Sequence, residues 1–211
     1  MIYLIGGPPR CGKTTVANKL SIDTGIPWVS TDTIEGMVKP YIDKADIARL
    51  FPIDTIRENT SSNEEMYNNN SATDIIRAYT AQGAITQPAI GGLIAYTLGD
   101  GHNIIIEGYH LAPKFIKEMI DQYGEKKIKA VIVTKQKSED FINNILLDQS
   151  ESCWVKNKSK NNKIYPKIAN MLSQYSDKIT KETNKYNLRI IEYKGDFIEQ
   201  TNRAVKTLKN I

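Results

Sequence analysis

The sequence predicts an α/β fold in which helices cover both faces of a five-stranded parallel sheet. Three observations lead to this prediction: short apolar runs, helical periodicity between them, and a glycine-containing loop after the first run. The expected strands are 2–5, 26–30, 104–108, 128–134 and 188–193. Strands that alternate with helices form parallel sheets with right-handed crossovers, so the carboxyl ends of all the strands are expected at one edge.

The first strand leads into a phosphate-binding pattern. Residues 7–14 read GPPRCGKT and fit G-x-x-x-x-G-K-S/T, followed at once by a helix. Glycines at both ends let the backbone turn its N–H groups toward a phosphate, and the helix N-terminus adds a favourable dipole. A chance match on a Gly/Pro turn is disfavoured by the flanking strand and helix. The residues expected to bind the nucleotide are Gly7, Pro8, Pro9, Arg10, Cys11, Gly12, Lys13, Thr14 and Thr15.

Two side chains of this loop carry the expected chemistry. Lys13 is expected to reach the β- and γ-phosphates and to act catalytically, and the Thr14 hydroxyl is expected to ligate Mg²⁺. The expected cofactors are therefore ATP and Mg²⁺.

Acidic residues follow two further strands. Asp32 comes just after the second strand, where ligands sit in parallel α/β sheets, and is expected to contact the substrate. It is also a candidate N-cap of the next helix, and the two roles are compatible. Glu107 ends the third strand, where a carboxylate holds Mg²⁺ through water or orients the attacking group. His110 follows in a loop, either lining the site or serving only as a hydrogen-bonding residue.

The region 40–98 is expected to be mainly helical and to bind the substrate. Residues 60–70 are rich in Ser and Asn and predict a loop, and residues 72–98 predict two helices divided at Gly83 and Pro88. Arginine suits bidentate contact with phosphate or carboxylate, so Arg57 and Arg77 are candidate substrate clamps. For each of them a surface salt bridge is an equally good interpretation.

Charge is unevenly distributed along the 211 residues. Residues 1–110 hold 8 basic and 12 acidic residues, whereas residues 111–211 hold 20 basic and 12 acidic ones. Lysines at 156, 158, 160, 163 and 167 concentrate the excess in a segment expected to be a lid, residues 150–167. Such a block binds nucleic acid, closes over phosphates or forms a solvated loop.

Length and composition favour a single domain covering residues 1–211. The first strand begins at residue 2, and no apolar run approaches the roughly eighteen residues of a membrane span. The two cysteines, Cys11 and Cys153, form neither a disulfide framework nor a metal pattern. We expect a cytoplasmic protein without a membrane partner, and the oligomeric state is left open.

Three segments together resemble a known family. GGPPRCGKTT, VSTDTI and IIIEGYHLAP occur in the order found in P-loop kinases of the 2-phosphoglycerate kinase-like group, with a weaker similarity to zeta-toxin-type kinases. The resemblance implies a P-loop NTPase three-layer sandwich with a helical lid. It also implies that Lys13 and Thr14 bind ATP·Mg²⁺, that Asp32 contacts the acceptor hydroxyl as a catalytic base or orienter, and that Glu107, also catalytic, lies by the metal and the acceptor. The sequence departs from these kinases in one respect. Their lids typically supply arginine to the transferring phosphoryl group, whereas residues 150–167 contain lysines but no arginine and so lack the fork geometry of its guanidinium.

The favoured function is therefore transfer of the ATP γ-phosphate to a hydroxyl of a small, possibly phosphorylated or carboxylated, metabolite. One alternative is a nucleic-acid-directed ATPase or polynucleotide kinase, which the modest net charge of +4 and the lack of aromatic residues among the lysines disfavour. The other alternative is a nucleotide-binding regulatory protein with little turnover.

Overall fold

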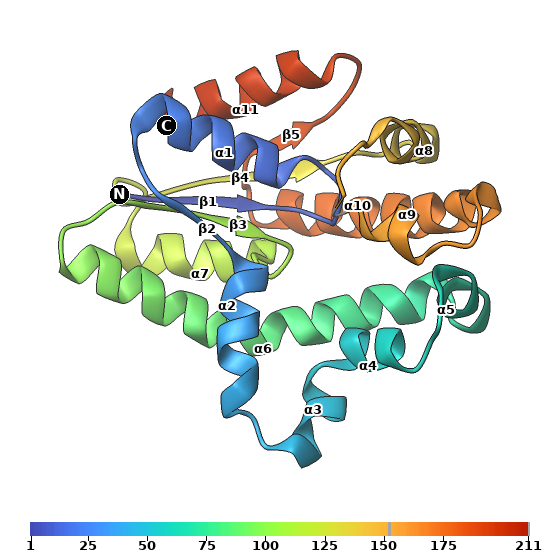
Figure 1. The fold of residues 1–211 in the computed structure, drawn as a ribbon. Helices are drawn as coiled ribbons and strands as arrows, with labels where there is room; N and C mark the ends of the chain where they lie inside the picture. The colour runs from blue at the N-terminus through green and yellow to red at the C-terminus, as the bar shows by residue number, and fades with distance from the viewer. Residues whose placement is uncertain (152, 211) are drawn as a thin grey trace.

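Five parallel strands form one sheet in the order β2-β3-β1-β4-β5 in the computed structural model, which describes residues 1–151 and 153–210 (Figure 1). The strands are β1 (Ile2–Gly6), β2 (Trp28–Ser30), β3 (Ile104–Gly108), β4 (Ile128–Thr134) and β5 (Ile190–Glu192). All five predicted strands are present, and the predicted α/β fold is confirmed. The central strand β1 pairs with β3 and β4, so the loop that follows β1 leaves the sheet between two neighbouring strand ends.

Helices cover the sheet on both faces. The helices before β3 are α1 (Lys13–Thr24), α2 (Thr31–Val38), α3 (Lys44–Leu50), α4 (Pro52–Glu58), α5 (Asn63–Asn69) and α6 (Ala72–Gly99), with a 3-10 turn at Lys39–Tyr41. Those after β3 are α7 (Pro113–Tyr123), α8 (Ser138–Leu147), α9 (Trp154–Lys158), α10 (Tyr165–Lys185) and α11 (Phe197–Asn210), with a 3-10 turn at Asn162–Ile164. Helices α1 and α11 lie together on one face, and α7 and α10 lie on the other (Figure 1).

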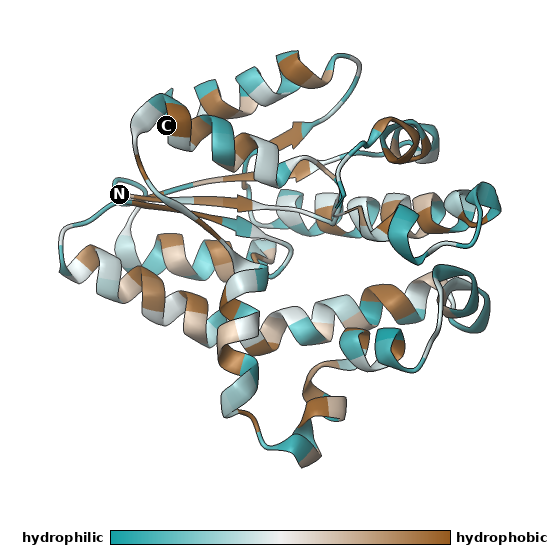
Figure 2. Cartoon of the chain, in the orientation of Figure 1, coloured by the Kyte–Doolittle hydropathy of each residue, from teal (hydrophilic) through white to brown (hydrophobic). Residues whose placement is uncertain are grey.

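The core follows from the composition of the strands. Ile2, Leu4 and Ile5 of β1 and residues 130–133 of β4 are buried. A strand covered by helices on both faces has to be apolar at nearly every position, and this is why these strands appear in the sequence as continuous apolar runs. Hydrophobic residues accordingly lie in the strands and on inward helix faces, whereas the region around α5 and α9 is mostly hydrophilic (Figure 2).

Two local predictions are wrong. Residues 63–69 form helix α5 instead of a loop, because Ser62 caps it by accepting a hydrogen bond from the Glu65 N–H. Residues 72–99 form one helix, α6, instead of two. Packing of α6 against α2, α4 and α10 offsets the poor helix propensity of Gly83 and the hydrogen bond that Pro88 cannot donate.

Helix α2 descends from the sheet and crosses the middle of α6, and helices α3 to α5 follow alongside the first part of α6 (Figure 1). They place a helical region next to the loop between β1 and α1. No helix in the described part of the chain combines the length and hydrophobicity needed to cross a bilayer.

Candidate active site

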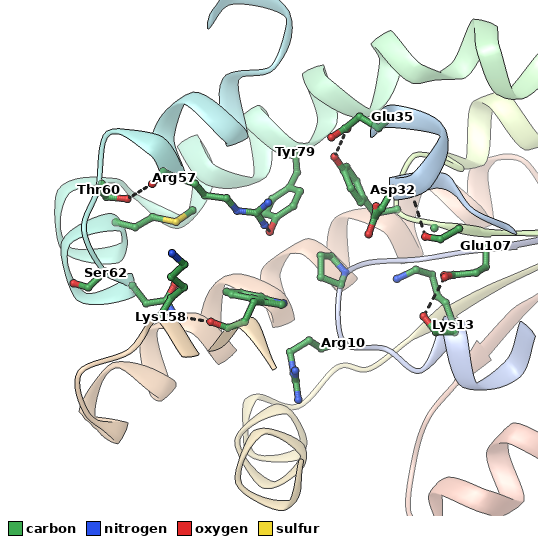
Figure 3. A pocket seen from close by; sticks show the side chains of 18 of the residues that line it. Arg10, Lys13, Asp32, Glu35, Arg57, Thr60, Ser62, Tyr79, Glu107 and Lys158 are labelled. Carbon is green, nitrogen blue, oxygen red and sulfur yellow. Dashed lines mark hydrogen bonds between the residues drawn. The ribbon is translucent and has the colours of Figure 1, made fainter. Parts of the chain in front are cut away.

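A cavity of about 630 Å³ lies at the carboxyl edge of the sheet (Figure 3). Its walls come from the loop after β1, the strand β3, the helices α2, α4, α5 and α6, and the segment around α9. Residues singled out from the sequence that line it are Pro9, Arg10, Lys13, Thr14, Asp32, Arg57 and Glu107. Residues from distant parts of the chain therefore meet at the edge where the parallel sheet was expected to bind its ligand.

The loop between β1 and α1 has the geometry of a phosphate cradle. Gly7 has φ 136°, and a Cβ there would lie 2.1 Å from the Val133 carbonyl oxygen, so only glycine fits. Lys13 is buried, and its ammonium donates to the Pro8 carbonyl at 2.8 Å. The backbone N–H groups of residues 12–15 donate to no acceptor among the described residues. These N–H groups at the start of a twelve-residue helix are available to an anion.

Two side chains of this loop point away from the cradle. The Arg10 guanidinium donates to Asp148 at 2.9 Å and to Cys153 Sγ at 3.4 Å. These two residues are the first and the last between α8 and α9, so Arg10 connects the loop after β1 to both ends of that connection. Burial alone would raise the pKa of Asp148, but hydrogen bonds from Ser150 and Arg10 hold it below its ordinary value. Cys11 is fully buried beside Ser176, and burial raises the pKa of its thiol.

Thr14 and Glu107 form a candidate Mg²⁺ site. The Thr14 hydroxyl donates to Glu107 Oε1 at 3.1 Å, and Glu107 is only 3% exposed. Burial raises the pKa of Glu107, against the opposing effects of Lys13 and the Thr14 hydrogen bond, so a bound cation would favour its ionised form. No group of three or more His, Cys, Asp or Glu suited to a metal occurs among the described residues. Two oxygen donors fit Mg²⁺, which usually binds through few protein ligands together with water and substrate phosphates.

Asp32 faces the same end of the cavity from helix α2. Ser30 is the N-cap of α2, and its hydroxyl accepts from the Asp32 N–H, so the alternative that Asp32 itself caps the helix is wrong. The Asp32 side chain is 74% exposed and lines the cavity beside Glu107 (Figure 3). Gly108 allows this placement of α2, since a Cβ there would lie 1.6 Å from the Thr31 hydroxyl.

His110 lies beneath the cavity instead of lining it. It is fully buried, with Nδ1 2.7 Å from the Thr31 hydroxyl and Nε2 2.6 Å from Glu35 Oε2. Glu35 also accepts hydrogen bonds from Tyr109 at 3.1 Å and Gln82 at 3.0 Å. Burial would raise the pKa of Glu35, but the hydrogen bonds from His110, Gln82 and Tyr109 outweigh it and lower the pKa below its ordinary value.

Glu35 lines the cavity and was missed from the sequence. It lies three positions after Asp32, a spacing that puts both carboxylates on one face of α2. Once Asp32 is identified, this three-residue spacing is the feature of the sequence that would have predicted Glu35 as a second carboxylate at the cavity.

The far end of the cavity is basic and aromatic. Arg57 on α4 lies 5.4 Å from the centre of the Tyr79 ring and 5.8 Å from that of Trp154, and it donates to the Tyr79 hydroxyl. Its guanidinium also pairs with Asp54 at 3.7 Å, so the salt bridge considered from the sequence is present beside the cavity contact. Lys158 lines the same end (Figure 3). Arg77 does not reach the cavity, because it lies on the exposed side of α6, where it is 75% exposed and pairs with Asp74. Tyr79 and Tyr109, which line the middle of the cavity, carry no sequence pattern that marks them.

Sequence comparison finds metabolite kinases. The chain is 34% identical to a 2-phosphoglycerate kinase of Pyrococcus furiosus over 119 residues, which are 56% of this chain and 37% of that protein. It is 28% identical to a mevalonate-3-phosphate 5-kinase of Thermoplasma acidophilum over 120 residues, which are 56% of this chain and 55% of that protein. The predicted resemblance to 2-phosphoglycerate kinases is confirmed, and the chain spans between a third and about half of the length of these relatives. No family model matches the chain.

Solved structures agree on the fold. A shikimate kinase of Bacteroides thetaiotaomicron superposes with a TM-score of 0.56 at 12% identity, covering 99% of this chain and 96% of that one. A gluconokinase of Sinorhizobium meliloti superposes with a TM-score of 0.53 at 9% identity, covering 98% and 90%. The chain has a P-loop NTPase α/β fold, which it shares with these two kinases. The predicted three-layer P-loop architecture is thereby confirmed, and the cavity described above opens beside the phosphate-binding loop of that fold.

Proposed function

We propose that this protein transfers the γ-phosphate of ATP to a hydroxyl of a small anionic metabolite. One observation carries the proposal: Lys13, Asp32 and Glu107, from three different elements, line one end of a cavity whose other end holds Arg57. A cavity with a phosphate cradle and an exposed carboxylate at one end and a cation at the other suits a donor phosphate and an anionic acceptor.

On the donor side, the loop binds the ATP phosphates through the free N–H groups of residues 12–15 and through Lys13. Lys13 leaves the Pro8 carbonyl and neutralises charge on the transferred phosphoryl group. Thr14 and Glu107 would hold Mg²⁺, and the ion would supply positive charge against the charge that develops on the transferred phosphoryl group.

On the acceptor side, Asp32 orients the attacking hydroxyl. Its exposed carboxylate accepts the hydroxyl proton while the hydroxyl oxygen bonds to the γ-phosphorus. The bond between the γ-phosphorus and the β,γ-bridging oxygen breaks, and ADP leaves. His110 lies behind this site and Glu35 lies on its wall, and both act as positioning residues because they fix α2 against the loop after β3.

The acceptor carries a negative group that Arg57 binds. Arginine's planar fork pairs bidentately with phosphate or carboxylate, and the Tyr79 ring holds it in place. The names of the two sequence relatives give acceptors that already carry a phosphate, 2-phosphoglycerate and mevalonate 3-phosphate. Arg77 has no part in this site because of its position on the outer side of α6.

A substrate screen tests the proposal. The purified chain is given ATP, Mg²⁺ and a panel of hydroxy compounds that includes 2-phosphoglycerate, mevalonate 3-phosphate, shikimate and gluconate. We expect ADP release to depend on one acceptor, a new phosphate ester to appear by mass spectrometry, and both to be lost in Lys13→Ala. ADP release that no acceptor in the panel stimulates, or a Lys13→Ala variant as active as the wild type, would contradict the proposal.

A further inference from the structure

The lysine-rich segment, residues 154–167, is bonded to the helical region on the acceptor side. Asn63 at the start of α5 donates to the Val155 carbonyl at 3.0 Å and to the Ser159 hydroxyl at 2.9 Å. Glu64 accepts from the backbone N–H groups of residues 160 and 161 at 2.8 and 3.1 Å. Lys167 donates to Asn68 at 2.7 Å. The segment is therefore held against α5 at several points along its length (Figure 1).

The same contacts bring two of its side chains to Arg57. The centre of the Trp154 ring lies 5.8 Å from the guanidinium carbon of Arg57. Lys158 reaches the cavity wall beside Thr60 and Ser62 (Figure 3). Among the described residues, the carboxylates that line the cavity are Asp32, Glu35 and Glu107, and all three belong to α2 or β3. The end near Arg57 thus has two cations and hydroxyl groups on its wall, whereas Asp54, which pairs with Arg57 at 3.7 Å, does not line the cavity.

We propose that Arg57, Trp154 and Lys158 form one subsite for a phosphate monoester on the acceptor, so that the lysine-rich segment selects the acceptor instead of covering the nucleotide. Only the identification of the ligand as the acceptor rests on the proposed kinase function. Arg57 supplies the bidentate fork, and Lys158 supplies a second charge that suits a dianion better than a carboxylate. Trp154 adds an aromatic ring 5.8 Å from the guanidinium carbon, within the range of a cation–π contact.

This arrangement also accounts for the absence of arginine from the lysine-rich segment. Helix α4 supplies the planar fork through Arg57, and the segment adds a point charge and an aromatic face to it. The contacts of Asn63 and Glu64 with the segment fix Lys158 relative to Arg57.

The chain provides its own reporter for this subsite. It has two tryptophans, Trp28 and Trp154, which both line the cavity, so in a Trp28→Phe background the tryptophan fluorescence, excited apart from that of the tyrosines, comes from Trp154 alone. A Lys13→Ala change in the same background weakens anion binding at the phosphate-binding loop. Inorganic phosphate is then titrated, and the fluorescence change is compared among three further variants: Arg57→Gln, Lys158→Gln and Lys163→Gln. Lys163 is the matched control, because it belongs to the same segment but does not line the cavity.

We expect phosphate to change the Trp154 fluorescence with a dissociation constant that Arg57→Gln and Lys158→Gln each weaken by about tenfold, the effect of one lost charge-assisted hydrogen bond. Lys163→Gln should leave the constant within about twofold of the parent. Equal effects of Lys158→Gln and Lys163→Gln, or no fluorescence response to phosphate, would overturn the subsite.

Nucleotide affinity supplies the second readout. Here Lys13 is left intact. Calorimetry with a non-hydrolysable ATP analogue and Mg²⁺ should give the same nucleotide affinity for Lys158→Gln as for the wild type. A selective loss of nucleotide affinity in Lys158→Gln would instead place the segment over the nucleotide and contradict the proposal. The titrations need no turnover, so a failed subsite and a failed kinase function give different results.

Discussion

Asp32 is the residue on which the acceptor chemistry depends. Its carboxylate is exposed at the cavity, and Ser30 carries out the capping of α2. We predict that Asp32→Asn lowers kcat by about 10²- to 10⁴-fold, the usual effect of losing an acid–base group, with KM for ATP little changed. Steady-state kinetics measures this.

Ser30→Ala serves as the control for a purely structural effect. It removes the cap and should lower Tm, and because Ser30 also lines the cavity and bonds to Glu107 its kcat should fall, but far less than that of Asp32→Asn, since the carboxylate of Asp32 remains. If Asp32→Asn lowered Tm and kept full turnover, Asp32 would have no role in catalysis.

Glu107 gives a prediction about pH. Burial raises its pKa in the folded chain, so between about pH 4, where an unfolded Glu titrates, and the folded pKa the folded state binds more protons than the unfolded state. Stability of the nucleotide-free protein therefore falls as pH rises through this window. We predict that Glu107→Gln, which stays neutral, has a higher Tm than the wild type at pH 7 and a similar Tm near pH 4.

Thermal unfolding from pH 4 to pH 8 without nucleotide measures the effect. The same variant should lose most of its turnover with ATP and Mg²⁺, since an amide is a poor ligand for Mg²⁺ beside Thr14. A wild type that is more stable than Glu107→Gln throughout this range would contradict the assigned effect of burial.

At the scale of elements, Glu35 joins several parts of the chain. Its carboxylate on α2 binds His110 after β3 and Gln82 on α6, and Gln82 in turn accepts from the N–H groups of Ile53 and Asp54 at the start of α4. This network links the helix that carries Asp32 to the helix that carries Arg57. A change at Glu35 should therefore reach both ends of the cavity.

We predict that Glu35→Gln lowers the free energy of unfolding by about 1–3 kcal/mol at pH 7, the range for hydrogen bonds to a charged group. The hydrogen bonds lower the pKa of Glu35 in the folded chain. The contribution of the Glu35 charge to the free energy of unfolding is then fully present above the ordinary pKa of about 4.3, and it is lost as pH falls through the lowered pKa of the folded state. Urea unfolding at pH 7 and pH 3 measures this, and an equal loss at both pH values would contradict the role of the charge.

The contact between β3 and α2 is a second test at this scale. A Cβ at Gly108 would meet the Thr31 hydroxyl at 1.6 Å, so Gly108→Ala forces α2 away from the strand. We predict a loss of about 2–4 kcal/mol in the free energy of unfolding, from overpacking and from positive φ together. Gly101→Ala is the control, because Gly101 also has positive φ but open space around it, and its loss should be near 1 kcal/mol. Equal losses of unfolding free energy in the two variants would show that the close contact between position 108 and Thr31 does not affect stability.

Most elements were predictable because their signals are local. Apolar runs gave the strands, and the alternation of strands with helices gave the parallel sheet. Helix α5 was missed although Ser62 and Glu65 have the S-x-x-E spacing of a capping box, because the surrounding Ser and Asn residues also favour a loop. The unbroken α6 was not predictable in this way, since tertiary packing overrides the propensities of Gly83 and Pro88.

At the scale of the whole molecule, the edge of the sheet brings the site together. The phosphate loop, Asp32 and Glu107 were predictable, because each follows a strand and parallel strands end at one edge. The acceptor end was only partly predictable. Arg57 and Arg77 have equal standing in the sequence, and the direction in which each helix presents its side chain decides between them. Trp154 lies close to Arg57 in space although the two residues are far apart in the sequence, and no local pattern predicts such a contact.

The most direct test of the central claim follows the phosphoryl group itself. ATP labelled in its γ-phosphoryl group is incubated with Mg²⁺, the acceptor found in the screen, and either the wild type or Asp32→Asn. The labelled group is then located by mass spectrometry. We predict that with the wild type the label appears in a phosphate ester of the acceptor, and that with Asp32→Asn ester formation falls by about 10²-fold or more. Label that appears only in inorganic phosphate, or ester formation that does not depend on Asp32, would contradict phosphoryl transfer at this site.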